Sequence, residues 1–183
     1  MMRAGSQRLI GLLIAVLGFA PAATALEPLD LAVKATYLYK LAPFVDWPQG
    51  AFAAPDSPFD LCVIGDDPFG PILDRAVAGQ HVGAHPIVVH RLPTVAGRSG
   101  CELAFVAGSK AQPVKDALRQ LSGSSVLTVT DNQPSRGIVD FIMEDGRVRF
   151  RIDDQAATEN GLTISSKLLS LAISVVPKRA RTP

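Results

Sequence analysis

The chain has 183 residues, with 18 Lys or Arg against 17 Asp or Glu, and its formal net charge at pH 7 is +1. This balance excludes the strongly basic surface on which nucleic-acid binding depends, so no nucleic-acid partner is expected.

The first 25 residues have the pattern of a cleavable secretory signal peptide. Arg3 and Arg8 form a basic start, an apolar run of 12 residues extends over 9–20, and Ala23-Thr24-Ala25 offers the small residues of a cleavage site. The apolar run is too short to span a bilayer. We therefore expect cleavage after residue 25, one soluble domain over 26–183, and no stable membrane insertion.

Helical and strand patterns alternate along the rest of the chain, which predicts an α/β fold. Trp47-Pro48 is expected to end the first helix, because the residue before a proline is disfavoured in helical geometry. The expected elements are a helix over 29–45, a strand over 59–65, a helix over 68–78, strands over 87–92 and 103–106, a helix over 112–121 and a strand over 126–130.

Cys62 and Cys101 are the only cysteines, and an oxidising compartment allows them to form a disulfide. Such a bridge would make the strands over 59–65 and 103–106 near neighbours, as in a doubly wound sheet. Two buried free thiols or a redox site are the alternatives, although the chain has no C-x-x-C motif.

Two strand patterns joined by Asp145-Gly146 predict a hairpin with a two-residue type I′ turn. One side of the hairpin is expected to face the core with Val139, Phe141, Met143, Val148, Phe150 and Ile152. The other side pairs Arg147, Arg149 and Arg151 with Glu144, Ile142 and Asp140. These arginines form either a docking stripe for an acidic partner or anionic ligand, or a solvated edge on which two of the three are neutralised across the strands, and the second interpretation is preferred.

After the hairpin, a short helix over 153–159 is expected to close at Asn160-Gly161. Ser165 or Ser166 can cap a final helix that is apolar on most sides, and this helix is predicted to be largely buried and to end at Pro177. The whole pattern predicts an α/β three-layer sandwich with a mainly parallel sheet that ends in an antiparallel hairpin.

No motif for a catalytic nucleophile or a phosphate-binding loop is present in the sequence, so we expect no enzyme, no catalytic residue and no cofactor. His81, His85 and His90 are close in sequence, but Gly83 and Pro86 exclude a helix that would align them. No metal site is expected there.

Asp66-Asp67-Pro68 follows the first strand, at the edge of the sheet where α/β proteins bind ligands and where receiver domains hold magnesium. A receiver domain is rejected because the strand ending at Val106 has no aspartate after it. We interpret the motif as an aspartate N-cap followed by proline at the first helical position.

Several stretches, taken in order, are similar to one known family. They are Lys34-Ala35-Thr36-Tyr37-Leu38-Tyr39-Lys40, Phe44-Val45-Asp46-Trp47-Pro48, Cys62-Val63-Ile64-Gly65-Asp66-Asp67-Pro68-Phe69-Gly70, Pro86-Ile87-Val88-Val89, Cys101 before a strand, and Gly161-Leu162-Thr163-Ile164-Ser165-Ser166-Lys167-Leu168-Leu169. Behind a signal peptide, this succession resembles the YfiR family. The resemblance implies a periplasmic protein that binds the sensor region of an inner-membrane diguanylate cyclase and represses cyclic di-GMP synthesis.

The resemblance also implies a disulfide between Cys62 and Cys101. The second cysteine pair of some members is absent from residues 131–143, so redox switching linked to that pair is not carried over. The family's partner surface is an apolar and charged patch in the C-terminal half. Arg149, Phe150 and Asp153 are therefore the candidate partner-binding residues.

One alternative function stays open beside the inhibitor and a second is weaker, and the oligomeric state is open as well. A periplasmic small-molecule binding module would hold its ligand near Asp66, Asp67 and Ser109. A homodimer could use Trp47, Phe52 and the apolar N-terminal helix. An exported enzyme of unknown type is the weakest.

Overall fold

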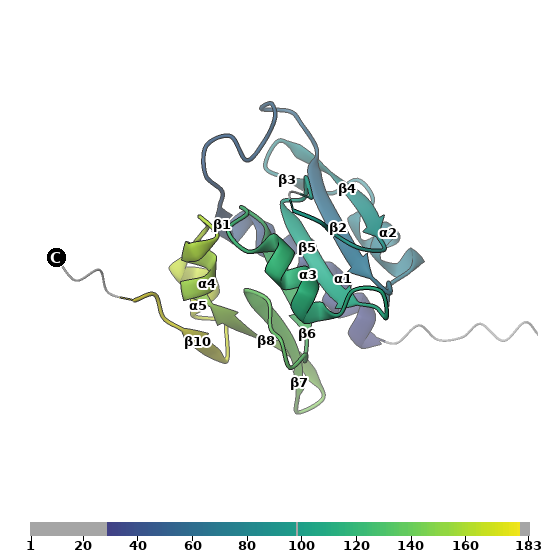
Figure 1. The fold of residues 1–183 in the computed structure, drawn as a ribbon, viewed down its shortest axis with the longest axis vertical. Coiled ribbons are helices and arrows are strands. Elements are labelled where there is room, and N and C mark those ends of the chain that lie inside the picture. The colour runs from purple at the N-terminus through teal and green to yellow at the C-terminus, as the bar shows by residue number, and fades with distance from the viewer. Residues whose placement is uncertain (1–28, 98, 180–183) are drawn as a thin grey trace, which may run out of the picture.

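A computed structural model describes residues 29–97 and 99–179. The predicted signal peptide, residues 1–25, lies outside these ranges. Within the described ranges, no helix is long and apolar enough to cross a bilayer. An eight-stranded sheet runs through the molecule, with helices on both of its faces (Figure 1).

The N-terminal helix is shorter than predicted. Helix α1 spans Leu29–Leu41, the 3₁₀ helix η1 spans Ala42–Phe44, and the short strand β1 covers Val45–Asp46. The prediction of a helix over 29–45 did not take Pro43 into account. Proline has no N–H for the helical hydrogen-bond ladder and its ring collides with the preceding turn, so the α-helix ends at Leu41.

The sheet is parallel across its centre. Strand β2 lies between β4 and β5, and β6 and β7 extend the parallel part on the β5 side. The two-residue strand β3, which the sequence analysis missed, pairs antiparallel with β4 at one edge. The elements of this part are β2 (Phe59–Gly65), α2 (Pro71–Val77), β3 (His81–Val82), β4 (His85–Leu92), β5 (Leu103–Gly108), α3 (Val114–Leu121), β6 (Leu127–Asp131) and β7 (Val139–Glu144).

Helix α2 does not begin where the sequence analysis put it. Its first residue is Pro71, and the preceding Gly70 has a φ of +48°. Asp67 is not the N-cap, since its Oδ1 accepts a hydrogen bond from the Phe69 N–H at 2.8 Å. The carboxylate therefore closes a local turn ahead of the helix.

The hairpin of β7 with β8 (Arg147–Asp153) has the predicted register, from Val139 opposite Ile152 to Glu144 opposite Arg147. Asp145 and Gly146 both have positive φ, as a type I′ turn requires. Of the residues predicted to face the core, Met143 is instead half exposed.

The predicted charge neutralisation across the hairpin is wrong. Buried Asp140 accepts a hydrogen bond from Thr130 at 2.7 Å and lies 3.8 Å from the Nε of Arg136. Arg147, Arg149 and Arg151 have no ion-pair partner in the part of the chain that the structure describes. The outward arginines thus keep their charge available.

The C-terminal segment differs most from expectation. Helix α4 (Asp154–Glu159) is followed by β9 (Thr163–Ile164), which pairs antiparallel with β1. Ser165 caps α5, but this helix covers only Ser166–Leu169. The chain then forms β10 (Ser174–Val176), parallel to β8. The prediction of a long buried final helix is wrong because the β-branched residues near its end pair with β8 as an edge strand.

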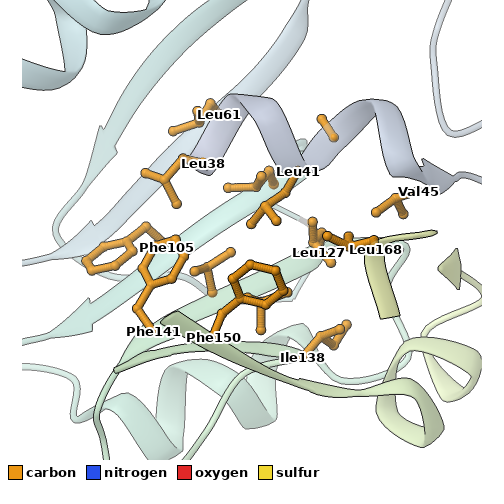
Figure 2. Packing of buried hydrophobic residues seen from close by; sticks show 14 of the residues in the cluster. Leu38, Leu41, Val45, Leu61, Phe105, Leu127, Ile138, Phe141, Phe150 and Leu168 are labelled. Carbon is orange, nitrogen blue, oxygen red and sulfur yellow. The ribbon is translucent and has the colours of Figure 1, made fainter. Parts of the chain in front are cut away.

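Three layers result, which confirms the predicted fold class. Helices α1 and α2 pack on one face of the sheet, and α3 packs on the other. Figure 2 shows Leu38 and Leu41 of α1 facing the sheet residues Phe105, Phe141 and Phe150. The sheet order is β10-β8-β7-β6-β5-β2-β4-β3, so β10 continues the sheet beyond the predicted terminal hairpin.

Candidate functional site

The three histidines make separate contacts. The His85 ring stacks on Phe52 with centroids 4.0 Å apart, and its Nδ1 donates to the Ser57 carbonyl at 2.7 Å. His90 Nε2 lies 2.8 Å from Asp60 Oδ1. Among the described residues, no group of three or more His, Cys, Asp or Glu side chains could hold a metal ion.

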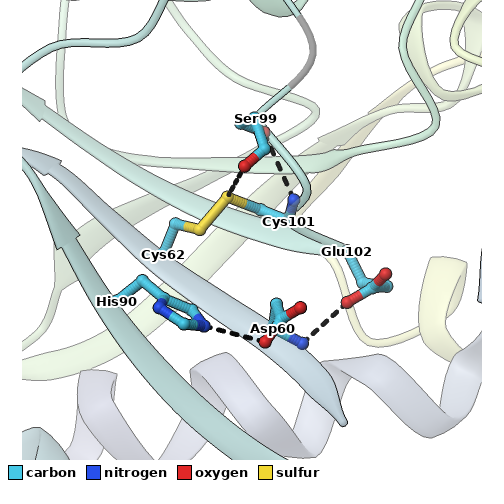
Figure 3. The surroundings of a disulfide bond; sticks show 6 residues. All are labelled: Asp60, Cys62, His90, Ser99, Cys101 and Glu102. Atoms are coloured by element: carbon cyan, nitrogen blue, oxygen red, sulfur yellow. Dashed lines mark hydrogen bonds and ion pairs between the residues drawn. A yellow bond between two sulfur atoms is a disulfide. The ribbon is translucent and has the colours of Figure 1, made fainter. Parts of the chain in front are cut away.

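Cys62 and Cys101 form a disulfide with a Cα–Cα distance of 6.0 Å (Figure 3). Both cysteines are buried, and the bond joins β2 to the segment that leads into β5. Nearby, the Asp60 N–H donates to Glu102 Oε2 at 2.6 Å. Burial raises the pKa of the Glu102 carboxyl, and only part of this effect is offset by that hydrogen bond.

The carboxyl ends of β2, β4 and β5 enclose an open hollow of about 540 Å³. Asp66 and Ser109 line it, as the ligand-binding alternative expected. Asp67 does not line it, and its carboxylate accepts a hydrogen bond from the Nε of Arg91 at 2.7 Å. Arg91 also contacts Asp74 at 2.9 Å, and both carboxylates raise the pKa of the Arg91 guanidinium. This cluster ties β4 to the α2 region.

A second hollow lies between α1 and β8, and we call it the α1–β8 groove. Its volume is about 240 Å³, and its lining consists of Tyr37, Lys40, Leu41, Phe44, Val148, Arg149, Phe150, Leu168 and Leu171. Buried Phe150 packs edge-on against Tyr37 with ring centroids 6.3 Å apart. The groove therefore has aromatic and aliphatic walls.

Local structure explains the arrangement of these residues. Helix α1 is held over the sheet by Leu38 and Leu41 and by a hydrogen bond of 2.7 Å from buried Lys34 to Asp131. On β8, strand alternation directs Val148 and Phe150 toward α1. Strand β10 pairs only with residues 151–153 of β8, so Arg149, which is exposed, lines the groove at an uncovered stretch of this edge strand.

An apolar edge adjoins the groove at Leu171. Leu171, Ile173, Val175 and Val176 are exposed by 58%, 39%, 36% and 53%. The sequence has no charged residue between Lys167 and Lys178. Large exposed apolar patches of this kind mark interaction surfaces in soluble proteins.

The structure brings together two of the three candidate partner-binding residues. Arg149 and Phe150 both line the α1–β8 groove. Asp153 does not line it and caps α4 instead, where its Oδ1 accepts from the Ala156 N–H at 2.8 Å. The sequence analysis missed Lys40 and Leu171, whose place at the groove depends on long-range packing.

The residues considered for a dimer surface are only partly exposed. Trp47 and Phe52 are each half-buried, and Trp47 packs edge-on against buried Phe59 with centroids 5.5 Å apart. A homodimer stays a prediction.

A family model described as YfiR/HmsC-like matches residues 31–173. The match extends from the first turn of α1 to the residue before β10 and so includes the whole groove. No curated protein matches the chain.

Proposed function

This chain belongs to the YfiR/HmsC-like family, and we propose that it is a periplasmic inhibitory protein. The family is regulatory rather than catalytic. In this proposal the chain is exported by cleavage after residue 25, and residues 26–183 act as one domain. The domain binds the periplasmic sensor region of an inner-membrane diguanylate cyclase and thereby represses cyclic di-GMP synthesis.

The observation that carries the proposal is the continuous surface formed by the α1–β8 groove and the apolar edge beside it. Groove residues such as Phe150 and Leu168 are held in place by the core, and Leu171 next to them is 58% exposed. Burial of one large aliphatic side chain contributes about 1.5–3 kcal/mol. A few such contacts around a preformed groove supply the central anchors that protein interfaces use.

Inhibition of this kind requires only differential binding. A protein that favours the inactive conformation of the sensor region by about 3 kcal/mol shifts that equilibrium more than about a hundredfold. No catalytic group is needed for this effect. The disulfide between Cys62 and Cys101 is consistent with the oxidising periplasm.

Deletion of the gene in its native host tests the proposal. We expect cyclic di-GMP to rise and to return to the original level with the exported chain, but not with a copy that lacks residues 1–25. A Leu171→Asp variant should fail to restore repression, because it places a charge in the apolar surface. No rise under several growth conditions would contradict the proposal.

A periplasmic small-molecule binding module is the second candidate. It is favoured by the hollow at the strand ends, whose volume of about 540 Å³ lies in the range of small-molecule sites. Asp66 and Ser109 would orient a ligand there. A tight ligand would raise the melting temperature of the isolated domain in the absence of any protein partner, and Asp66→Asn would reduce that rise.

A further inference from the structure

The charged residues that line the α1–β8 groove are cations. Asp30 lines a neighbouring hollow, where its carboxylate lies 3.6 Å from the Nζ of Lys34. Lys40 and Arg149 belong to the lining of the groove, and the Nζ of Lys167 lies 5.6 Å from the centroid of the ring of Phe44, another lining residue. No carboxylate lines the groove. None of the three cations has an ion-pair partner within residues 29–97 and 99–179. This excess is local, since the whole chain has a formal net charge of only +1.

The three cations come from different elements and lie in or next to a lining that is mostly apolar. Lys40 is in the last turn of α1, Arg149 is on β8, and Lys167 is in α5. The apolar part of the lining includes Tyr37, Phe150 and Leu168. Positive charges above a low-dielectric surface produce a local potential that attracts anionic groups and strengthens ion pairs formed there.

The size of the groove favours side chains over a free small molecule. Its volume of about 240 Å³ is below the range of about 300–1,000 Å³ that is usual for small-molecule sites. A hollow of this size holds one or two large apolar side chains, which is how central anchors occupy a partner's surface.

We propose that the α1–β8 groove receives a segment of a protein partner in which one or two large apolar side chains are flanked by carboxylates. The apolar side chains fill the space against Tyr37 and Phe150, and the carboxylates pair with Lys40, Arg149 and Lys167. This inference rests on the proposed function, because the partner is taken to be the sensor region of the cyclase. It adds the place of contact and the chemistry of the bound segment.

The first test uses the purified mature chain and overlapping 15-residue peptides that cover the periplasmic regions of the host's inner-membrane diguanylate cyclases. We expect the bound peptides to be acidic and to contain Leu, Phe, Tyr or Trp. Lys40→Glu and Arg149→Glu should each weaken binding by about tenfold or more, and added salt should weaken it further. Lys115→Glu is the matched control, because Lys115 is exposed on α3 on the opposite face of the sheet.

Binding of basic or uncharged peptides with equal affinity would overturn the inference, as would an equal effect of Lys115→Glu. Two other occupants give distinct results. If Lys40→Glu and Arg149→Glu abolish binding to phosphatidylglycerol vesicles while no peptide binds, the groove is a lipid site. If they abolish a dimer seen by analytical ultracentrifugation, the occupant is a second copy, whose exposed Met143 is followed by Glu144 and Asp145.

The same variants, expressed in the deletion strain, separate this inference from the proposed function. Repression lost with Arg149→Glu but kept with Lys115→Glu, at equal protein level and melting temperature, supports both. A rise in cyclic di-GMP on deletion that Arg149→Glu fully reverses overturns the groove assignment and leaves the proposed function standing. No rise on deletion contradicts the proposed function, and the peptide experiment then decides the groove assignment alone.

Discussion

Reduction of the disulfide should cost this protein about 4 kcal/mol of unfolding free energy without unfolding it. Cys62 and Cys101 are 39 positions apart. With a loop of this length, the chain-entropy relation gives a loss of about 13 cal/mol/K in the unfolded ensemble, or about 3.9 kcal/mol at 25 °C. The main-chain pairing of β2 with β5 does not depend on the bond. A domain whose total stability is about 5–15 kcal/mol should therefore stay folded.

The assay compares urea unfolding of the oxidised and reduced protein, followed by circular dichroism. For a slope of about 2 kcal/mol/M, the midpoint should fall by about 2 M on reduction. The variant Cys62→Ala/Cys101→Ala should behave like the reduced protein and should not respond to reductant. It should also retain repression below its melting temperature, because the bond stabilises the domain and takes no part in a redox signal.

Two results would refute this reasoning. A midpoint change below about 0.5 M would mean that the bond does not restrict the unfolded chain as the entropy model requires. Full loss of repression by a double variant that is still folded would instead indicate the redox role that was one of the alternatives.

Three further predictions concern the core, the strand ends and pH. Leu38→Ala should lower the unfolding free energy by about 2–5 kcal/mol, because Leu38 is fully buried on the side of α1 that faces the sheet. A loss below about 1 kcal/mol would contradict the packing shown in Figure 2. Gly65→Ala should destabilise much more than Gly50→Ala, although both glycines have positive φ. A Cβ at Gly65 would lie 2.3 Å from the Gly108 carbonyl oxygen, whereas one at Gly50 meets nothing within 4 Å; equal melting temperatures would contradict this contact. The pKa of the Glu102 carboxyl is raised in the folded protein, so folding favours the protonated form. The contribution of this carboxyl to stability is therefore present at low pH and is lost as the pH rises through the pKa of the folded state. Glu102→Gln should therefore become more stable relative to the original chain as pH increases from 4 to 7, and a difference that does not depend on pH would count against the burial effect.

The hairpin was predictable because its determinants are local. Asp145-Gly146 fixes the turn, and the alternation on both sides of it fixes the register of β7 and β8. The C-terminal segment was not predictable in the same way. The run from Leu168 to Val176 is almost continuously apolar, so its periodicity does not separate helix from strand. The strand β10 forms because the edge of β8 offers unpaired main-chain groups with which residues 174–176 can pair.

One wall of the groove could be predicted from the sequence, and the other could not. The resemblance to the YfiR family directed attention to Arg149 and Phe150, and both line the groove. Its other wall required knowledge that α1 packs over β8, more than 100 residues later in the chain. The free charge of Arg149 was predictable, because the register expected from the sequence already placed it opposite uncharged Ile142. The free charges of Arg147 and Arg151 were not predictable, since Glu144 and Asp140 stand opposite them.

The most direct test of the account is the cyclic di-GMP level of a deletion strain that carries either the exported chain, a copy without residues 1–25, or no copy. Repression from the periplasm predicts a raised level with no copy and with the copy without residues 1–25, and the original level with the exported chain. Equal levels in all three strains, under conditions in which the exported chain is present, would contradict it.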